Sequence, residues 1–89
     1  MNEISVEFLT RGGCHLCEEA WPAVRRAVRW SGVTVVEVDV DDRDDLVRDY
    51  GLRIPVVRAG GSVVAEGRID PVGLWWRLVR LRFNPSGGS

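Results

Sequence analysis

The sequence predicts an α/β fold in which a four-stranded mixed sheet carries helices on both faces, with the elements in the order β-α-β-α-β-β-α. Three observations predict it: short β-branched runs bounded by turn residues, longer segments with apolar side chains at helical spacing, and a Gly-Gly pair between the last two runs. The 89 residues leave room for one hydrophobic core. We therefore expect one domain over residues 1–83 and a flexible C-terminal tail over residues 84–89.

The N-terminal third predicts a strand followed by a long helix. Apolar and polar side chains alternate over residues 4–9, which is typical of a strand, and residues 10–13 form a turn. Helical spacing then runs from about residue 14 to residue 30, and Gly32 is placed to end the helix. The apolar stripe of this helix consists of Cys17, Ala20, Trp21, Val24, Ala27 and Val28. Pro22 lacks the amide proton that a helix interior uses, so we expect the helix axis to bend there.

The middle of the chain predicts a strand and a short helix. Residues 33–40 form a β-branched run. The segment 41–45, which contains four aspartates and Arg43, then opens a helix that extends to Tyr50, because carboxylates favour the positive end of a helix. The residues expected to face the core from this helix are Leu46, Val47 and Tyr50. We interpret the acidic cluster from residue 39 to residue 49 as a solvated helix start rather than as a metal site.

The last third predicts a hairpin and a helix. Residues 53–58 form a third strand, in which Pro55 indicates an edge, a bend or a cis peptide bond. The turn over residues 59–62, whose two glycines accept positive φ angles, leads into a fourth strand that ends at residue 66. Asp70 and Pro71 suit the N-cap and the first position of a helix that extends to about residue 82. Its expected apolar face consists of Val72, Leu74, Trp75, Leu78, Val79 and Leu81, and one of the adjacent Trp75 and Trp76 should be exposed.

Composition limits the classes of function. Charged residues make up 28% of the chain and nearly cancel at a net charge of −1, so the basic face of a nucleic-acid-binding protein is not indicated. No apolar run approaches the roughly 18–20 residues of a membrane span, and the N-terminal residues do not resemble a signal peptide. We therefore expect a cytoplasmic monomer that binds neither nucleic acid nor membrane.

The two cysteines, Cys14 and Cys17, carry the strongest functional signal. They are the only cysteines in the chain, and they lie where the first strand meets the first helix. Helical positions i and i+3 are about 5–6 Å apart, within the roughly 4.4–6.8 Å that separates the Cα atoms of a disulfide, so the pair can open and close with little backbone motion. In a reducing compartment such a pair is redox-active or binds metal. A purely structural crosslink across so short a loop would constrain the unfolded chain little.

Metal binding is the main alternative for the cysteine pair. Tetrahedral zinc takes four ligands, whereas this chain offers two cysteines and one histidine, His15. A site shared between two chains would supply the missing ligands. A metal or iron–sulfur module that uses Cys14, and a non-catalytic adaptor with a partner-specific surface, are therefore the alternative functions.

Cys14 is predicted to lie at a helix N-terminus, and this position would make it the nucleophile. A free thiol with a pKa near 8.5 is only about 3% thiolate at pH 7, and the thiolate is the attacking species. The unpaired N–H groups and the positive dipole end of a helix stabilise the thiolate form. Arg11, and His15 when protonated, could add to this effect, although His15 could also be an ordinary exposed residue. Cys17 faces the core and would act as the resolving thiol.

Three segments carry a resemblance to a known family: Cys14-His15-Leu16-Cys17 at the first helix, Ile54-Pro55 at the third strand, and Gly67-Arg68-Ile69-Asp70 before the last helix. Together with the element order, they resemble a minimal glutaredoxin-like protein of the thioredoxin-fold superfamily over residues 4–82. The resemblance implies a thiol–disulfide oxidoreductase that reduces protein or glutathione mixed disulfides and is itself reduced by an unidentified reductase. It implies no tightly bound cofactor, with glutathione as the candidate co-substrate.

The resemblance also implies roles for residues around the cysteines. The Ile54–Pro55 peptide would be cis, with the backbone before the proline free to pair with an extended substrate. Arg11 and Arg53 would hold a carboxylate such as those of glutathione, or would simply remain solvated. Gly67 would lie in the substrate site, and Asp70 would cap the last helix or bind the glutathione amine.

Overall fold

The computed structural model describes residues 4–83, so the predicted tail over residues 84–89 lies outside the described residues. The elements are, in chain order, β1 (Ser5–Thr10), α1 (His15–Ser31), β2 (Thr34–Asp39), the 3-10 helix η1 (Val40–Asp42), α2 (Asp44–Tyr50), β3 (Val56–Ala59), β4 (Ser62–Glu66) and α3 (Pro71–Phe83). Apart from η1, this is the predicted order.

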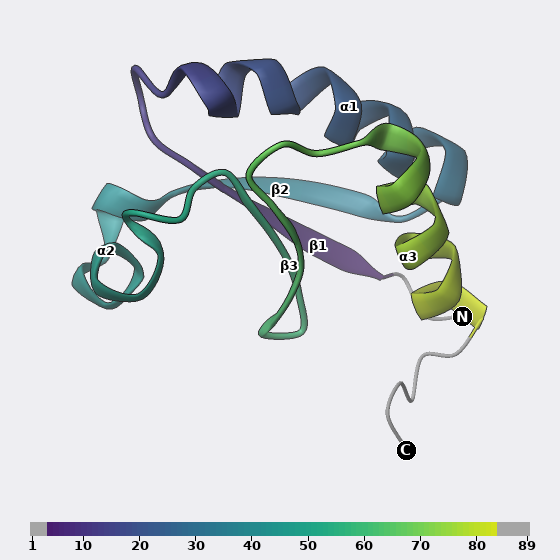
Figure 1. The fold of residues 1–89 in the computed structure, drawn as a ribbon. Helices are drawn as coiled ribbons and strands as arrows, with labels where there is room; N and C mark the ends of the chain where they lie inside the picture. The colour runs from purple at the N-terminus through teal and green to yellow at the C-terminus, as the bar shows by residue number, and fades with distance from the viewer. Residues whose placement is uncertain (1–3, 84–89) are drawn as a thin grey trace.

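The four strands form one mixed sheet in the order β2-β1-β3-β4. β1 runs parallel to β2 and antiparallel to β3, and β4 runs antiparallel to β3. Figure 1 shows α1 and α3 along one face of the sheet, and the shorter α2 packs on the opposite face. The predicted α/β fold, with a mixed four-stranded sheet between helices, is therefore confirmed.

Local sequence explains where α1 begins and ends. Cys14 is the N-cap residue and has extended backbone angles. Gly32 ends the helix in the left-handed conformation at φ 81°, which glycine adopts without steric cost. Pro22 lies inside the helix, which continues through it to Ser31. Arg82, near the end of α3, donates a hydrogen bond to the Ser31 carbonyl, so the C-terminal ends of α1 and α3 are joined.

The sheet has a hydrophobic cluster on each face. The larger cluster lies between the sheet, α1 and α3, and its buried residues include Val6, Phe8, Cys17, Ala20, Val24, Ala27, Val57, Leu74 and Leu78. The smaller cluster packs under α2 and consists of Leu9, Val40, Leu46 and Val56. Consecutive strand residues point to opposite faces, so both clusters are built from the same strands. The apolar stripe predicted for α1 is thus part of the larger cluster.

The acidic segment folds differently from the prediction. The sequence predicts one helix over residues 41–50, whereas the structure has η1 followed by α2. The Asp39 carboxylate accepts a hydrogen bond from the Asp41 amide and caps η1, and extended backbone angles at Arg43 separate the two helices. Val47, expected in the core, is 39% exposed, because the short helix α2 presents only one side to the sheet.

β4 is an outer strand of the sheet and is partly shielded. It follows the predicted turn, in which Gly60 and Gly61 both have the positive φ angles of a tight hairpin. A β-bulge interrupts the pairing of β3 with β4, and Val64 has no Cα partner on β3. The Arg77 guanidinium, from α3, donates a hydrogen bond to the Val64 carbonyl. The carbonyl at the bulge of this edge strand is therefore bound by a side-chain donor from α3.

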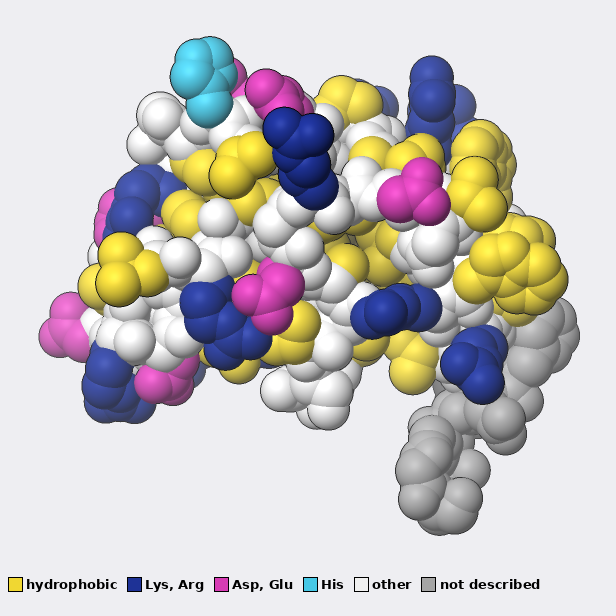
Figure 2. Space-filling view, in the orientation of Figure 1, with side chains coloured by type: hydrophobic (Ala, Val, Ile, Leu, Met, Phe, Trp, Pro, Cys, Tyr) yellow, Lys and Arg dark blue, Asp and Glu magenta, His cyan; other side chains and the backbone are white. Residues whose placement is uncertain are grey.

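The surface mixes charged and apolar side chains. Figure 2 shows acidic and basic groups close together over much of one face, with exposed apolar groups over the α3 end at the right. Trp76 is 58% exposed and Trp75 is only partly exposed, so the predicted division of this pair is confirmed. Among the described residues, a helix with the length and hydropathy needed to span a membrane is absent.

We predict that Leu78→Ala lowers the free energy of unfolding by about 2–5 kcal/mol, because it opens a cavity in the larger cluster. Leu78 is fully buried there. Leu52→Ala is the matched control: it makes the same chemical change at a fully exposed side chain and should alter the free energy by less than about 0.5 kcal/mol. Urea denaturation followed by circular dichroism measures both, and equal losses in the two variants would contradict this description of the core.

Candidate active site

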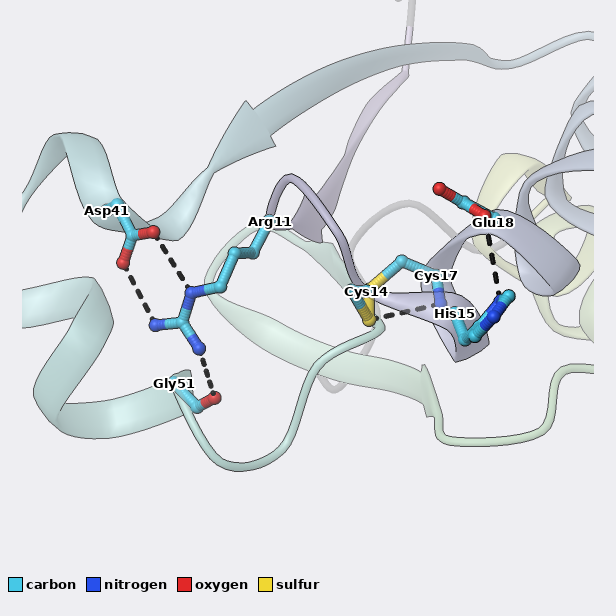
Figure 3. Close-up of a disulfide and its surroundings, with 7 residues drawn as sticks. All are labelled: Arg11, Cys14, His15, Cys17, Glu18, Asp41 and Gly51. Carbon is cyan, nitrogen blue, oxygen red and sulfur yellow. Dashed lines mark hydrogen bonds and ion pairs between the residues drawn. A yellow bond between two sulfur atoms is a disulfide. The ribbon is translucent and has the colours of Figure 1, made fainter.

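Cys14 and Cys17 form a disulfide at the start of α1, with their Cα atoms 5.2 Å apart. This separation lies within the roughly 4.4–6.8 Å range of protein disulfides, as the spacing predicts. The Cys14 Sγ also accepts a hydrogen bond from the Cys17 amide at 3.1 Å (Figure 3). The first sulfur is therefore held against one of the N–H groups that the first turn of a helix leaves unpaired.

The two sulfur-bearing residues differ in exposure. Cys14 is partly exposed, whereas Cys17 is 2% exposed and belongs to the larger cluster. A second molecule therefore reaches Cys14 first, while Cys17 lies one helical turn further in. An attacking thiol and a resolving thiol require this asymmetry.

A short glycine loop leads the chain from β1 to Cys14. Gly13 has φ 80°, in the left-handed region that favours glycine. The Cys14 amide donates to the Arg11 carbonyl at 3.3 Å, which closes the turn. The Gly12-Gly13 pair thus allows a sharp change of direction from the sheet into α1.

The Arg11 side chain points away from the cysteines (Figure 3). Its Nε and Nη2 donate to the two carboxylate oxygens of Asp41 at 3.0 and 2.9 Å, and its Nη1 donates to the Gly51 carbonyl at 3.4 Å. One guanidinium thus joins the loop before Cys14 to η1 and to the end of α2. Because these hydrogen bonds of the Arg11 side chain lead to Asp41 and Gly51 and not to a cysteine, its predicted effect on the thiol pKa stays a prediction.

This ion pair shifts the pKa of both of its members. Hydrogen bonding to Asp41 raises the pKa of Arg11, and hydrogen bonding from Arg11 lowers the pKa of Asp41 below its ordinary value of 3.8. Both side chains keep contact with solvent, at 34% and 52% exposure. The contact is therefore an ionised surface pair whose strength depends on salt.

His15 is almost entirely exposed, with 93% of its side chain in contact with solvent. Its Nδ1 lies 3.7 Å from a carboxylate oxygen of Glu18, and Figure 3 shows the ring on the Glu18 side, away from the Cys14 sulfur. These surroundings favour the interpretation of an ordinary exposed residue. An effect of His15 on the thiol pKa stays a prediction.

The Ile54–Pro55 peptide bond is cis, as the resemblance implies. The Ile54 amide, however, donates to the Tyr50 carbonyl at 3.1 Å. The expectation that the whole backbone before the proline is free is therefore wrong for the N–H group, whereas the Ile54 carbonyl has no donor among the described residues. The Pro55 carbonyl accepts from the Gly67 amide at 2.9 Å, which brings Gly67 beside the proline.

Arg53 is paired within the protein. Its Nη2 and Nε donate to the two carboxylate oxygens of Glu66 at 2.9 and 3.3 Å, and its guanidinium lies 5.3 Å from the centre of the Tyr50 ring. Hydrogen bonding to Glu66 raises the pKa of Arg53, and the same contact lowers the pKa of Glu66. The carboxylate beside Arg53 is thus one of the protein's own.

Asp70 caps α3, so this part of its prediction is confirmed. Its carboxylate accepts from the Gly73 amide at 2.8 Å, and its carbonyl accepts from the Leu74 amide at 2.9 Å. Caps of this kind stabilise a helix by about 1 kcal/mol. A contact of Asp70 with the glutathione amine stays a prediction.

One hollow reaches the cysteine pair. It has a volume of about 550 Å³ and is lined by Cys17, with Arg11 and Trp21 also in its wall. A hollow of about 250 Å³ lies between Leu16 on α1 and the segment that contains Gly67 and Arg68, and another of about 540 Å³ lies between β4 and α3. Neither of these two includes a cysteine, so of the three hollows only the first opens beside the disulfide.

The acidic segment from residue 39 to residue 49 has structural contacts. Asp39 caps η1, Asp41 binds Arg11, and Asp45 accepts two hydrogen bonds from Arg43. Within the described residues 4–83, His, Cys, Asp and Glu side chains are nowhere grouped in threes so that they could hold a metal ion. These contacts agree with the interpretation of a solvated helix start.

Sequence reasoning missed the residues that hold the site together, namely Asp41, Tyr50, Gly51 and Glu66. Asp41 lies 30 residues from Arg11, and Glu66 lies 13 residues from Arg53. No local pattern connects partners at such separations. The only signal in the sequence was that acidic residues are plentiful after the second strand.

Known proteins match most of the chain in sequence. The sequence model of the family described as Glutaredoxin-like domain (DUF836) matches residues 5–74. A protein of Dictyostelium discoideum, named glutaredoxin-like protein YDR286C homolog, is 28% identical over 81 residues, which covers 84% of this chain and 75% of that protein.

Solved structures share the fold. The structural genomics target protein XcR50 from X. campestris is 32% identical with a TM-score of 0.67, and the match covers 82% of this chain and 93% of that one. A mutant thioredoxin from Halobacterium salinarum NRC-1 is 27% identical with a TM-score of 0.63, over 89% of this chain and 74% of that one. The fold described above is therefore the thioredoxin fold.

We predict that the coupling between Arg11 and Asp41 stabilises the protein above about pH 4 and fades in acid. Because the pKa of Asp41 lies below its ordinary value of 3.8, the ionised carboxylate favours the folded state. Its contribution is complete above the unfolded-state pKa and is lost as the pH falls through the lower folded-state pKa. A double-mutant cycle with Arg11→Gln and Asp41→Asn, in urea at about pH 6 and about pH 2.5, measures the coupling. Coupling that is equally large in acid would refute this assignment.

Proposed function

Because this chain belongs to the glutaredoxin-like domain family and carries a disulfide at the start of α1, we propose that it is a thiol–disulfide oxidoreductase. It reduces disulfides of protein substrates, or mixed disulfides with glutathione, by a dithiol cycle through Cys14 and Cys17. It works as a monomer without a bound prosthetic group, in the cytoplasm, where thiols are kept reduced. A reductase or a small thiol returns it to the dithiol state.

The hydrogen bond from the Cys17 amide to the Cys14 Sγ carries this proposal. A donor aimed at sulfur favours the negatively charged thiolate over the neutral thiol, and the positive end of the α1 dipole acts in the same direction. Both effects lower the pKa of a thiol at this position. Cys14 is therefore suited to attack a disulfide at neutral pH and also to leave from one.

The cycle has two exchange steps. The Cys14 thiolate attacks one sulfur of the substrate disulfide, and the other substrate sulfur leaves as a thiolate that takes up a proton. Cys17 then loses its proton and attacks the Cys14 Sγ, which forms the intramolecular disulfide and releases the second substrate sulfur. Two electrons and two protons pass from the protein to the substrate. With the two Cα atoms 5.2 Å apart, the second step requires little backbone movement.

The surface around Cys14 supports contact with an extended chain. Leu16 and Leu52 are exposed apolar side chains on the two segments that hold the cysteines and the cis proline. Cys14 and Ile54 pack against the same larger cluster. A substrate backbone that crosses this surface finds the Ile54 carbonyl as an acceptor, while the Ile54 amide stays with Tyr50.

Cys14→Ser should reduce the turnover of a protein disulfide to the uncatalysed rate, because serine cannot supply a thiolate. The assay is the reduction of an insulin-type disulfide in the presence of excess dithiothreitol. Circular dichroism establishes that the variant is folded. Turnover that remains at the wild-type rate would remove Cys14 from the mechanism.

Cys17→Ser should accumulate a mixed disulfide between Cys14 and the substrate, because the resolving thiol is gone. Mass spectrometry of the reaction without added thiol detects the adduct as the summed mass of protein and substrate. The Cys14→Ser/Cys17→Ser double variant is the control and should form none. If Cys17→Ser also forms no adduct, the resolving role of Cys17 is wrong.

A further inference from the structure

Both arginines that the sequence offers as carboxylate anchors are occupied by carboxylates of the protein. Arg11, in the loop before the cysteines, makes two hydrogen bonds to Asp41. Arg53, directly before Ile54–Pro55, makes two hydrogen bonds to Glu66. In each pair the planar guanidinium meets both carboxylate oxygens, which is the strongest arrangement of such a contact.

A carboxylate on an incoming thiol could bind either arginine only by displacing its present partner. The exchange replaces one carboxylate by another, so it adds little to the binding energy of the thiol. It also leaves Asp41 or Glu66 unpaired next to the incoming carboxylate, and like charges repel. Arg11 would in addition lose its contact with the Gly51 carbonyl.

The hollow beside the disulfide adds further negative charge. Cys17 lines it together with Glu18, Glu37, Asp39 and Asp42. Among the ion pairs of the described residues, none includes Glu37 or Asp42, and Glu18 meets only a histidine, at 3.7 Å. An anionic molecule that approaches the disulfide through this hollow is therefore repelled.

We propose that Asp41 and Glu66 make the disulfide discriminate against anionic thiols such as glutathione, which carries two carboxylates and one ammonium group. The inference rests on the proposed thiol–disulfide chemistry and names the partner class within it, namely neutral or cationic thiols. Each of the two carboxyl groups has a lowered pKa, so each is ionised and available to its arginine at neutral pH.

Reduction of the oxidised protein by a small thiol measures this discrimination directly. A probe thiolate attacks the Cys14 Sγ, the bond between the two cysteines breaks, and Cys17 leaves as a thiolate that is protonated. A second probe thiolate then attacks the probe sulfur of the mixed disulfide and releases the oxidised probe. Two probe thiols thus supply two electrons and two protons to the protein disulfide. No natural substrate or reductase is needed.

The experiment compares glutathione with glutathione diethyl ester, which has the same thiol and peptide skeleton but lacks both carboxylates. Acid-quenched samples are alkylated, and mass spectrometry gives the fraction of reduced protein. Rates are expressed per probe thiolate, because the two thiols differ in pKa. For the wild-type protein at low salt, the ester should react about tenfold faster than glutathione, and the difference should shrink as salt is added. Dithiothreitol, which is uncharged, reports how readily the disulfide itself is reduced.

Four variants test which side chains cause the difference between the rates with the ester and with glutathione. Asp41→Asn and Glu66→Gln each release one arginine, and each should lower the ester-to-glutathione ratio by about two- to fivefold. Arg11→Gln/Asp41→Asn removes both members of one pair, keeps the net charge and should leave the ratio near that of the wild type. Asp49→Asn breaks the Arg48–Asp49 pair on α2, which lies outside the hollow, and reports the effect of net charge alone.

Each outcome decides the proposal. A wild-type ratio near one overturns it, and so does a preference for glutathione over the ester. A ratio that Asp41→Asn and Glu66→Gln leave unchanged also overturns it, as does an equal change in the dithiothreitol rate. If Asp41→Asn does not fold, the rate ratio of Glu66→Gln and the salt dependence of the wild-type ratio decide between the two outcomes. Failure of the proposed function looks different, because the wild-type ratio would hold while the insulin assay showed no turnover.

Discussion

Every helix leaves its first N–H groups without partners inside the helix, and in α1 one of these groups meets a sulfur atom. This contact depends on three features: the end of β1 in the middle of the sheet, the turn made with Gly13 at positive φ, and the buried stripe that seats α1 on the sheet. Because Cys17 belongs to that stripe, the packing of the larger cluster also decides where the second sulfur lies. The redox geometry and the hydrophobic core are thus set by the same helix.

Three segments from different parts of the chain meet around the disulfide, and polar contacts join them. Arg11 reaches the Gly51 carbonyl after α2, and the Gly67 amide before α3 binds the Pro55 carbonyl. The sheet and α1 are held by apolar packing, whereas these three segments are joined by hydrogen bonds near solvent. Regions of this kind open at lower free energy than the core, so these hydrogen bonds are expected to break before α1 separates from the sheet.

The features that the sequence predicts correctly are those that depend on neighbours in the chain. The stripe of α1, the Gly32 terminus, the Gly60-Gly61 turn and the Asp70 cap each follow from a few adjacent residues. Two predictions differ because of short-range contacts that helical spacing and charge do not describe: the acidic segment breaks at Arg43, and the Ile54 amide binds Tyr50. The partners of Arg11 and Arg53 are missed for another reason, because they lie 30 and 13 residues away and charge counts along the chain say nothing about which acids lie nearby in space. Residue types therefore identify the reacting atoms, and only the folded arrangement identifies their electrostatic surroundings.

The bulge in β4 has a consequence for how one copy of this protein meets another. An outer strand exposes backbone donors and acceptors that a strand from a neighbouring chain can use, which is a common route to aggregation. Here Val64 has no Cα partner on β3, and its carbonyl accepts a hydrogen bond from the Arg77 guanidinium of α3. A foreign strand would have to displace this cation and match an irregular edge before it could extend the sheet. The C-terminal helix therefore does more than cover the core, since one of its side chains binds the backbone of an edge strand at its irregular point.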